Sequence, residues 1–364
     1  MTRESLGGGM TDTRDNIASV VERTRRLSLD APVVDVRFLG DVAAFVVGEE
    51  ALLLLSRNGE DRRVAVHGGA ILCAAGGGER VVTGGDDGKV VATDASGTST
   101  VIATDAKHRW IDHVALGPAG ALAWSAGKTA FVHSGKGAEH ALDVPSTVGA
   151  LAFLPKGFRL AIAHYGGATL WFPSAKAEPE RLEWKGSHLA ATVSPDGRFL
   201  VTGMQEPMLH GWRLVDSKHM RMSGYSARVR SLSWSADGEH LATSGSEQLI
   251  LWPFDGKDGP MGRQPRILAR AETRVTVVNC HPRHPVVAVG YADGTVKLVR
   301  IDDDALILVR ESDGTPVSAL GWDAAGQMLA FGTESGAGGI LALRTPRCTI
   351  TVTHCAHSGS GTSV

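Results

Sequence analysis

Apolar residues fall along this chain in short runs that predict β-strands. Runs rich in Val, Ile, Leu, Ala and Phe alternate with Gly-containing turns, as where Ser-Pro-Asp-Gly at 194–197 leads into the apolar run 199–203. Helical spacing of apolar residues is nearly absent after residue 30. Continuous apolar runs suit strands whose sheets are covered on both faces. The pattern therefore predicts an all-β protein in which each sheet packs between two others.

The same order of strands and turns recurs about every 40 residues, which is the spacing of a four-stranded repeat unit. Asp-Gly pairs such as those at Asp87 and Asp293 supply the positive φ angles that tight hairpins need. Such small sheets are stable only when assembled side by side. The first strands of eight units are expected to begin at Val33, Ile71, Ile111, Val148, Leu189, Val229, Val275 and Val317.

The repeats resemble the WD-repeat family of β-propellers, in a divergent form of bacterial type. The segments 84–94 and 290–300 look like the turn and third strand of the family's signature, and the resemblance covers residues 25 to 343. The signature tryptophan falls on Trp171, Trp212 and Trp252, but none of these is followed by aspartate. The resemblance implies a propeller of four-stranded blades.

Closure of the ring determines the expected blade count and domain limits. The last unit, from Val317, has room for three strands, and family propellers usually close by adding an N-terminal strand to such a unit. We therefore expect eight four-stranded blades closed by Thr24–Ser28. The alternative is seven blades, with the weak first unit excluded. On this interpretation 1–23 is an extension, partly disordered or a short helix, 24–343 is the propeller, and 344–364 is a disordered tail.

The resemblance also implies hydrogen-bonded networks inside blades. In the family, a His before the first strand, a Ser or Thr on the second and an Asp in the following hairpin can be linked. His67, Thr83 and Asp87 match these positions in the second unit. In the sixth unit Tyr225 stands at the His position, with Trp252 on the third strand. Because buried polar groups need partners, we expect structural roles for the matched residues.

Composition and charge narrow the functional classes. The chain has 364 residues, 43% of them hydrophobic, and a formal net charge of −2, which argues against nucleic acid as the main ligand. No apolar run approaches the ~20 residues that span a bilayer. We expect a cytoplasmic protein, monomeric alone, without cofactor or bound metal. The cysteines on predicted first strands, Cys73 and Cys280, are expected to be reduced, and Cys348, His354, Cys355 and His357 in the tail lack a zinc-knuckle spacing.

Recognised catalytic motifs are missing from the sequence, so the first interpretation is non-catalytic. Asp35, Asp112 and His113 on predicted first strands would face the ring axis. They support an alternative function as a propeller hydrolase or small-ligand binder. Three polar groups on two blades are more typical of hydrogen-bonded strand residues than of a site.

The remaining candidate is one face of the ring, which we call the loop face. It collects the loops that join each outer strand to the next inner strand, together with the turns between second and third strands. Exposed Tyr, Trp, Arg and Met commonly anchor protein interfaces. The sequence therefore predicts a scaffold that binds proteins or peptides there. The predicted anchors are Trp110, Arg109, Tyr165, Met204, Tyr225, Arg228, Arg274 and Tyr291.

Overall fold

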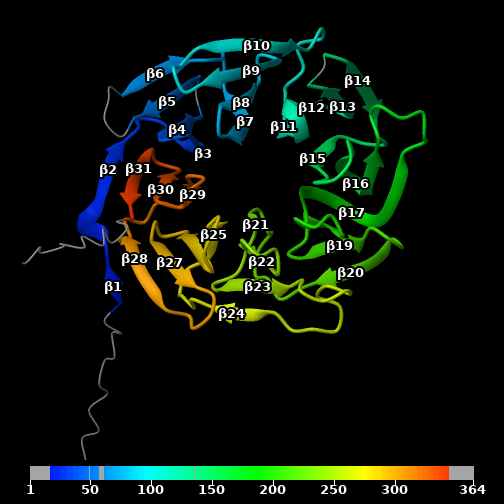
Figure 1. Ribbon diagram of the computed structural model, residues 1–364. Coiled ribbons are helices and arrows are strands. Elements are labelled where there is room, and N and C mark those ends of the chain that lie inside the picture. The colour runs from blue at the N-terminus through cyan, green and yellow to red at the C-terminus, as the bar shows by residue number, and fades with distance from the viewer. Residues whose placement is uncertain (1–16, 49, 57–60, 136, 344–364) are drawn as a thin grey trace, which may run out of the picture.

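The structure, a computed structural model, describes residues 17–48, 50–56, 61–135 and 137–343. The chain makes one circuit of a ring of β-sheets, each running from an inner strand near the ring axis to an outer strand at the rim (Figure 1). The prediction of an all-β propeller is confirmed. The expected tail at 344–364, its cysteine and histidine residues, and most of the N-terminal extension lie outside the described residues.

Both faces of the strands are apolar because both faces meet another sheet. In β4 (Val42–Val47), Phe45 packs in a cluster with Met328 and Ala330 of the last sheet, whereas Val46 packs in a cluster with Val81 of the next sheet. Successive side chains of a strand point to opposite faces, so one strand fills two inter-sheet cores. The continuous apolar runs of the sequence follow from this double packing.

The first three sheets each hold four antiparallel strands in chain order. A 3₁₀ turn, η2 (Pro118–Gly120), joins the first two strands of the third. The strands are β3 (Val33–Leu39), β4, β5 (Ala51–Leu55) and β6 (Arg62–Ala65); β7 (Ile71–Gly77), β8 (Arg80–Gly85), β9 (Lys89–Asp94) and β10 (Ser99–Thr104); and β11 (His113–Leu116), β12 (Leu122–Ala126), β13 (Thr129–His133) and β14 (Glu139–Asp143).

The next sheet has six strands and corrects the expectation of eight separate four-stranded blades. Its strands are β15 (Val148–Phe153), β16 (Leu160–Trp171), β17 (Glu180–Val193), β18 (Phe199–Met204), β19 (Leu209–Arg213) and β20 (Lys218–Met222). One end of β17 pairs with β16 at Glu183, and the other pairs with β18 at Thr192. The described part of the chain therefore forms seven separate sheets, as in the alternative. The alternative excluded the first unit, but this unit forms a complete sheet. The number is reduced instead because β17 continues unbroken through two repeat units. The described ring thus holds eight repeat units in seven sheets.

The following two sheets return to the four-stranded repeat, and the second gains a fifth strand at its outer edge. There β1 (Ala18–Ser19) pairs with β28 in parallel. The repeat strands are β21 (Leu232–Trp234), β22 (His240–Thr243), β23 (Leu249–Pro253) and β24 (Arg266–Leu268), then β25 (Val275–Cys280), β26 (Val286–Tyr291), β27 (Val296–Arg300) and β28 (Leu306–Arg310).

The last sheet closes the ring with an N-terminal strand. Its three C-terminal strands are β29 (Val317–Trp322), β30 (Met328–Thr333) and β31 (Ala337–Ala342), and β2 (Thr24–Ser28) pairs antiparallel with β31 from Thr24 opposite Leu341 to Ser28 opposite Ala337. The segment between β1 and β2 forms a 3₁₀ turn, η1 (Val21–Arg23). The predicted closing strand therefore occupies the predicted place (Figure 1).

Both cysteines of the described chain lie on inner strands and are free thiols, as expected. Burial raises the pKa of the Cys73 thiol, and likewise that of Cys280, to about 12. Because the thiolate is the reactive form, neither thiol is activated as a nucleophile at neutral pH.

Candidate functional site

The matched residues of the second sheet form a hydrogen-bonded chain within the blade. Nδ1 of His67, just before β7, lies 2.9 Å from Oδ1 of Asp87, and Nε2 lies 2.8 Å from Oγ1 of Thr83 on β8. Burial tends to raise the pKa of Asp87, but hydrogen bonds from His67 and from the Gly68 and Lys89 amides hold it below its ordinary value. The arrangement is structural, because it joins three segments of one sheet.

Tyr225 forms the equivalent network in the sixth unit and is therefore not a surface anchor. Its side chain is buried; the hydroxyl lies 2.9 Å from Oγ1 of Thr243 and accepts a 2.7 Å hydrogen bond from Nε1 of Trp252. Burial is also the main cause that raises the pKa of the Tyr225 phenol. The expectation that Tyr225 is an exposed anchor is wrong, because the phenol reaches inward to the position that His67 fills in the second unit.

Two further predicted anchors lie in the interior. Tyr291, at the end of β26, is fully buried and donates a 3.0 Å hydrogen bond to the carbonyl oxygen of Ala269. Met204, at the end of β18, is also buried. Both expectations of exposure are wrong: Tyr291 packs in an apolar cluster with Leu268 and Val275, and the Met204 side chain lies against Gly186.

Two aromatic side chains on the loop face are open to solvent. Trp110, between β10 and β11, is 61% exposed, and Tyr165, in the turn within β16, is 64% exposed. The amide of Tyr165 donates a 2.9 Å hydrogen bond to Oγ of Ser146, which ties this turn to the loop that precedes the sheet. A large aromatic surface is thus held on a hydrogen-bonded backbone, as an interface anchor requires.

Arg109, beside Trp110, is held within its own loop. Its guanidinium lies 2.7 Å from Oδ1 of Asp105 and donates a 3.0 Å hydrogen bond to the carbonyl oxygen of Ala126. The hydrogen bonds from Arg109 hold the pKa of Asp105 at about 2. Arg109 therefore fixes the loop that presents Trp110.

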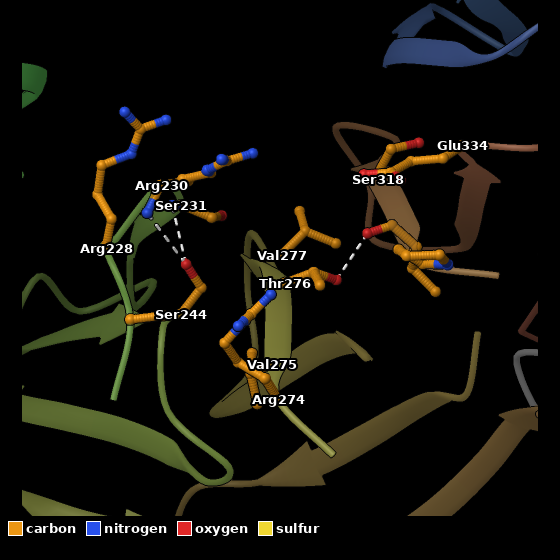
Figure 2. A pocket seen from close by; sticks show the side chains of 13 residues that line it. Arg228, Arg230, Ser231, Ser244, Arg274, Val275, Thr276, Val277, Ser318 and Glu334 are labelled. Atoms are coloured by element: carbon orange, nitrogen blue, oxygen red, sulfur yellow. Dashed lines mark hydrogen bonds between the residues drawn. The ribbon is translucent and has the colours of Figure 1, made fainter. Parts of the chain in front are cut away.

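A cavity of about 580 Å³ opens on the loop face where the last three repeat units meet. We call it the arginine cavity, because Arg228, Arg230 and Arg274 line it together with Glu334 (Figure 2). The first two arginines come from the segment before β21, Arg274 from the residue before β25, and Glu334 from the turn after β30. The cavity thus brings together Arg228 and Arg274, two of the predicted anchors, far from each other in the sequence.

Hydroxyl groups of the cavity wall hold the backbone that carries the arginines. Oγ of Ser244 accepts hydrogen bonds from the amides of Arg230 (3.3 Å) and Ser231 (3.0 Å), as Figure 2 shows. Oγ1 of Thr276 donates a 2.6 Å hydrogen bond to the carbonyl oxygen of Val317 in the neighbouring sheet. These hydroxyls are already engaged with backbone, so the guanidinium groups are the cavity's chief means of contacting a ligand.

One glycine is required for the shape of this wall. Gly245, with φ +94°, carries the turn after β22 so close to the preceding loop that an added Cβ would lie 2.9 Å from the Ala227 carbonyl oxygen. Its amide donates to the carbonyl oxygen of Val275, and its own carbonyl oxygen accepts from the Ala227 amide. A side chain at this position would separate the two segments that bear Arg228 and Arg274.

The polar residues near the ring axis form no combined site among the described residues. Asp35 accepts a 2.8 Å hydrogen bond from the amide of Val36 and pairs with Arg37 at 2.7 Å. Burial lowers the pKa of His113. Within the described part of the chain, no group of three His, Cys, Asp or Glu side chains is placed to hold a metal ion. Asp35 therefore has a structural ion pair, and the axis offers Asp112 and His113 without the third group of a metal site.

Arg230 and Glu334 were not predicted from the sequence as site residues. Arg230 stands at the second position after Arg228, so both arginines of this segment belong to one wall of the cavity. The spacing of two residues between Arg228 and Arg230 could have been used to predict Arg230 as a site residue. Glu334 follows β30 in another repeat unit, and its place depends on how the units are arranged around the ring.

Comparisons with known proteins identify one repeat directly. Residues 217–252 match the family model described as WD domain, G-beta repeat. WD repeat-containing protein 1-B of Xenopus laevis is 27% identical over 137 residues, which are 37% of this chain and 20% of that protein. WD repeat-containing protein 1 of Gallus gallus is 24% identical over 151 residues, 40% of this chain and 22% of that protein. The chain therefore matches about a fifth of the length of these curated relatives.

The architecture is similar to that of a solved structure. The computationally designed Ika8 protein superposes with a TM-score of 0.71 and 17% sequence identity, covering 87% of this chain and 98% of that chain. At this identity the likeness concerns the fold alone. No helix in the described part of the chain is long and apolar enough to span a membrane.

Proposed function

We propose, from the premise that the chain is a WD-repeat β-propeller, that it is a non-catalytic scaffold that binds proteins or peptides on its loop face. The observation that carries this proposal is the exposure of Trp110 and Tyr165 on hydrogen-bonded loops of the same face. WD-repeat propellers are typically protein-interaction scaffolds. A broad aromatic side chain loses little rotamer entropy on binding and buries much apolar surface, which favours association.

The proposal also covers the protein's compartment, its oligomeric state and the classes of ligand that it does not bind. We place it in the cytoplasm, monomeric until it binds a partner, with neither nucleic acid nor membrane as a ligand. A formal net charge of −2 supports the exclusion of nucleic acid as the main partner.

The test begins with capture of partners on immobilised protein from an extract of the organism that makes it, followed by mass spectrometry. The captured protein is then purified and titrated against the wild type and against the double variant Trp110→Ala, Tyr165→Ala. We expect the double variant to bind at least tenfold more weakly, with an unchanged melting temperature, because both side chains are largely exposed.

Val215→Ala is the matched control. Val215 is 86% exposed and lies in the loop between β19 and β20, on the opposite face of the ring. This variant tests whether the loss of any exposed apolar side chain weakens partner binding. Equal affinity of the wild type and the Trp110, Tyr165 double variant for every purified partner would overturn the assignment to the loop face.

A further inference from the structure

The arginine cavity holds positive charge that the described part of the protein does not neutralise. Among the described residues, the side chain of Arg228 makes one hydrogen bond, 3.1 Å to the neutral amide oxygen of Gln205. Those of Arg230 and Arg274 make no hydrogen bond or ion pair with a described residue. Elsewhere on the described surface arginines commonly pair with carboxylates, as Arg25 does with Asp61 at 2.8 Å.

The nearest carboxylates leave the cavity basic. Glu334 lines it but forms no ion pair with a described residue, and Figure 2 shows it across the hollow from Arg228 and Arg230. Glu247, in the turn after β22, accepts a hydrogen bond from Oγ of Ser226, which is the main cause that lowers its pKa; the charge of Arg274 adds a smaller effect, without an ion pair between the two described residues. Among the described residues, the lining of the cavity therefore holds three guanidinium groups and one carboxylate, that of Glu334.

The positive charges of the arginines in the cavity repel one another. Burial, and after it the positive charge of Arg230, lowers the pKa of the Arg228 guanidinium. Mutual repulsion of this kind is relieved when an anion enters between the groups. Since the whole chain carries a formal net charge of −2, the basic character is local to this cavity.

We propose that the arginine cavity binds an acidic segment of a partner protein, with carboxylate side chains seated between Arg228, Arg230 and Arg274. The inference rests on the scaffold function proposed above and gives its partner a chemical character. Guanidinium groups bind carboxylates through paired, charge-assisted hydrogen bonds.

The size and position of the cavity favour a peptide over a free ion. Its volume of about 580 Å³ is in the range that takes a ligand of many atoms, and a single small anion would leave most of it filled with water. The guanidinium groups come from two separate loops, so a chain with several carboxylates can contact both. The cavity also opens on the face that carries Trp110 and Tyr165, where the rest of a partner would find apolar contacts.

The test uses fluorescein-labelled octaglutamate, with labelled octaglutamine as the neutral probe, in fluorescence anisotropy titrations at low ionic strength. We expect the wild type to bind octaglutamate and not octaglutamine. The double variant Arg230→Gln, Arg274→Gln should bind octaglutamate at least tenfold more weakly, while its melting temperature stays that of the wild type. The matched control is Arg63→Gln, which removes an exposed arginine from the outer strand β6.

Four outcomes would overturn the inference: no binding of octaglutamate, an equal loss in Arg63→Gln, displacement of octaglutamate by an equal concentration of inorganic phosphate, or tighter binding of a labelled oligothymidylate. The first two show that the cavity does not select acidic chains, the third indicates a small-anion site, and the fourth a nucleic-acid site. A partner that depends on Trp110 and Tyr165 but not on Arg230 and Arg274 would leave the scaffold proposal standing while this inference fails.

Discussion

Nδ1 of His67 lies 2.9 Å from Oδ1 of Asp87, and this contact joins the segment before β7 to the hairpin between β8 and β9. The other ring nitrogen of His67 reaches Thr83 at 2.8 Å, so a single buried side chain connects three segments of one sheet. Asp87 also accepts hydrogen bonds from the amides of Gly68 and Lys89. The contact therefore organises the loop-face end of the second sheet.

The substitution Asp87→Ala should destabilise the protein by about 1–3 kcal/mol, because it leaves a buried ring nitrogen and two amides without their acceptor. Urea unfolding followed by tryptophan fluorescence measures the change. Asp86→Ala is the control, since no side-chain hydrogen bond or ion pair of Asp86 is found among the described residues. Equal destabilisation by the two variants would contradict the structural role of the His67 contact.

Tyr225→Phe tests the second network. The change removes the hydroxyl that accepts from Nε1 of Trp252, so a buried indole N–H loses its partner and we expect a loss of about 1–3 kcal/mol. Tyr165→Phe, which alters an exposed phenol, should change the free energy of unfolding by less than about 0.5 kcal/mol. If Tyr225→Phe were as stable as the wild type, the buried network would not contribute to folding.

Much of the fold could be predicted because the repeat pattern is local and redundant. The resemblance to WD-repeat propellers is confirmed, and Thr24–Ser28 was assigned as the closing strand because the last unit visibly lacked one. The number of separate sheets could not be predicted in this way. It depends on the segment between Trp184 and His188, where β17 passes from one repeat unit into the next with Gly186 at φ +106°.

The candidate site was less predictable because exposure depends on neighbours from distant segments. Tyr165 and Tyr225 both lie in Gly-containing stretches of the loop face, yet one is 64% exposed and the other 8%. The difference arises because the Tyr225 hydroxyl hydrogen-bonds Thr243 and Trp252, whereas the side chain of Tyr165 makes no hydrogen bond with a described residue. Composition alone cannot distinguish these cases.

Removal of residues 1–29 should open the ring. The deletion eliminates β2, whose Leu27 packs against the core shared by the first and last sheets, and it leaves β31 as an unpaired edge. We expect a lower melting temperature and aggregation, because an exposed strand edge pairs with other chains. Differential scanning calorimetry and light scattering measure the two effects.

The matched control for this deletion removes residues 1–16 and retains both β1 and β2. It should melt as the full chain does. If the two truncated proteins had the same melting temperature as the full chain, closure by β2 would not contribute to stability.

Histidines in the region of β17–β20 should make the propeller sensitive to acid. His210 on β19 is fully buried, and neither of its ring nitrogens has a hydrogen-bond partner among the described residues. Its ring stacks on Trp184 with centroids 4.1 Å apart. Burial, and then the positive charges of His188, His219 and Arg221, lowers the pKa of His210 to about 3.

The direction of the pH effect follows from this lowered pKa. Above about pH 6.5, the ordinary pKa of histidine, His210 is neutral in the folded and unfolded chains and causes no pH dependence. Between about pH 6.5 and pH 3 only the unfolded chain binds the proton, so stability falls as pH falls, by up to about 1.4 kcal/mol per pH unit.

His210→Phe keeps the stacked ring and removes the titration. The variant should therefore lose less stability than the wild type between pH 6.5 and pH 4, measured by urea unfolding, whereas His108→Asn, at an exposed histidine with a positive φ, should follow the wild type. Identical slopes for the wild type and His210→Phe would show that His210 does not carry the acid sensitivity.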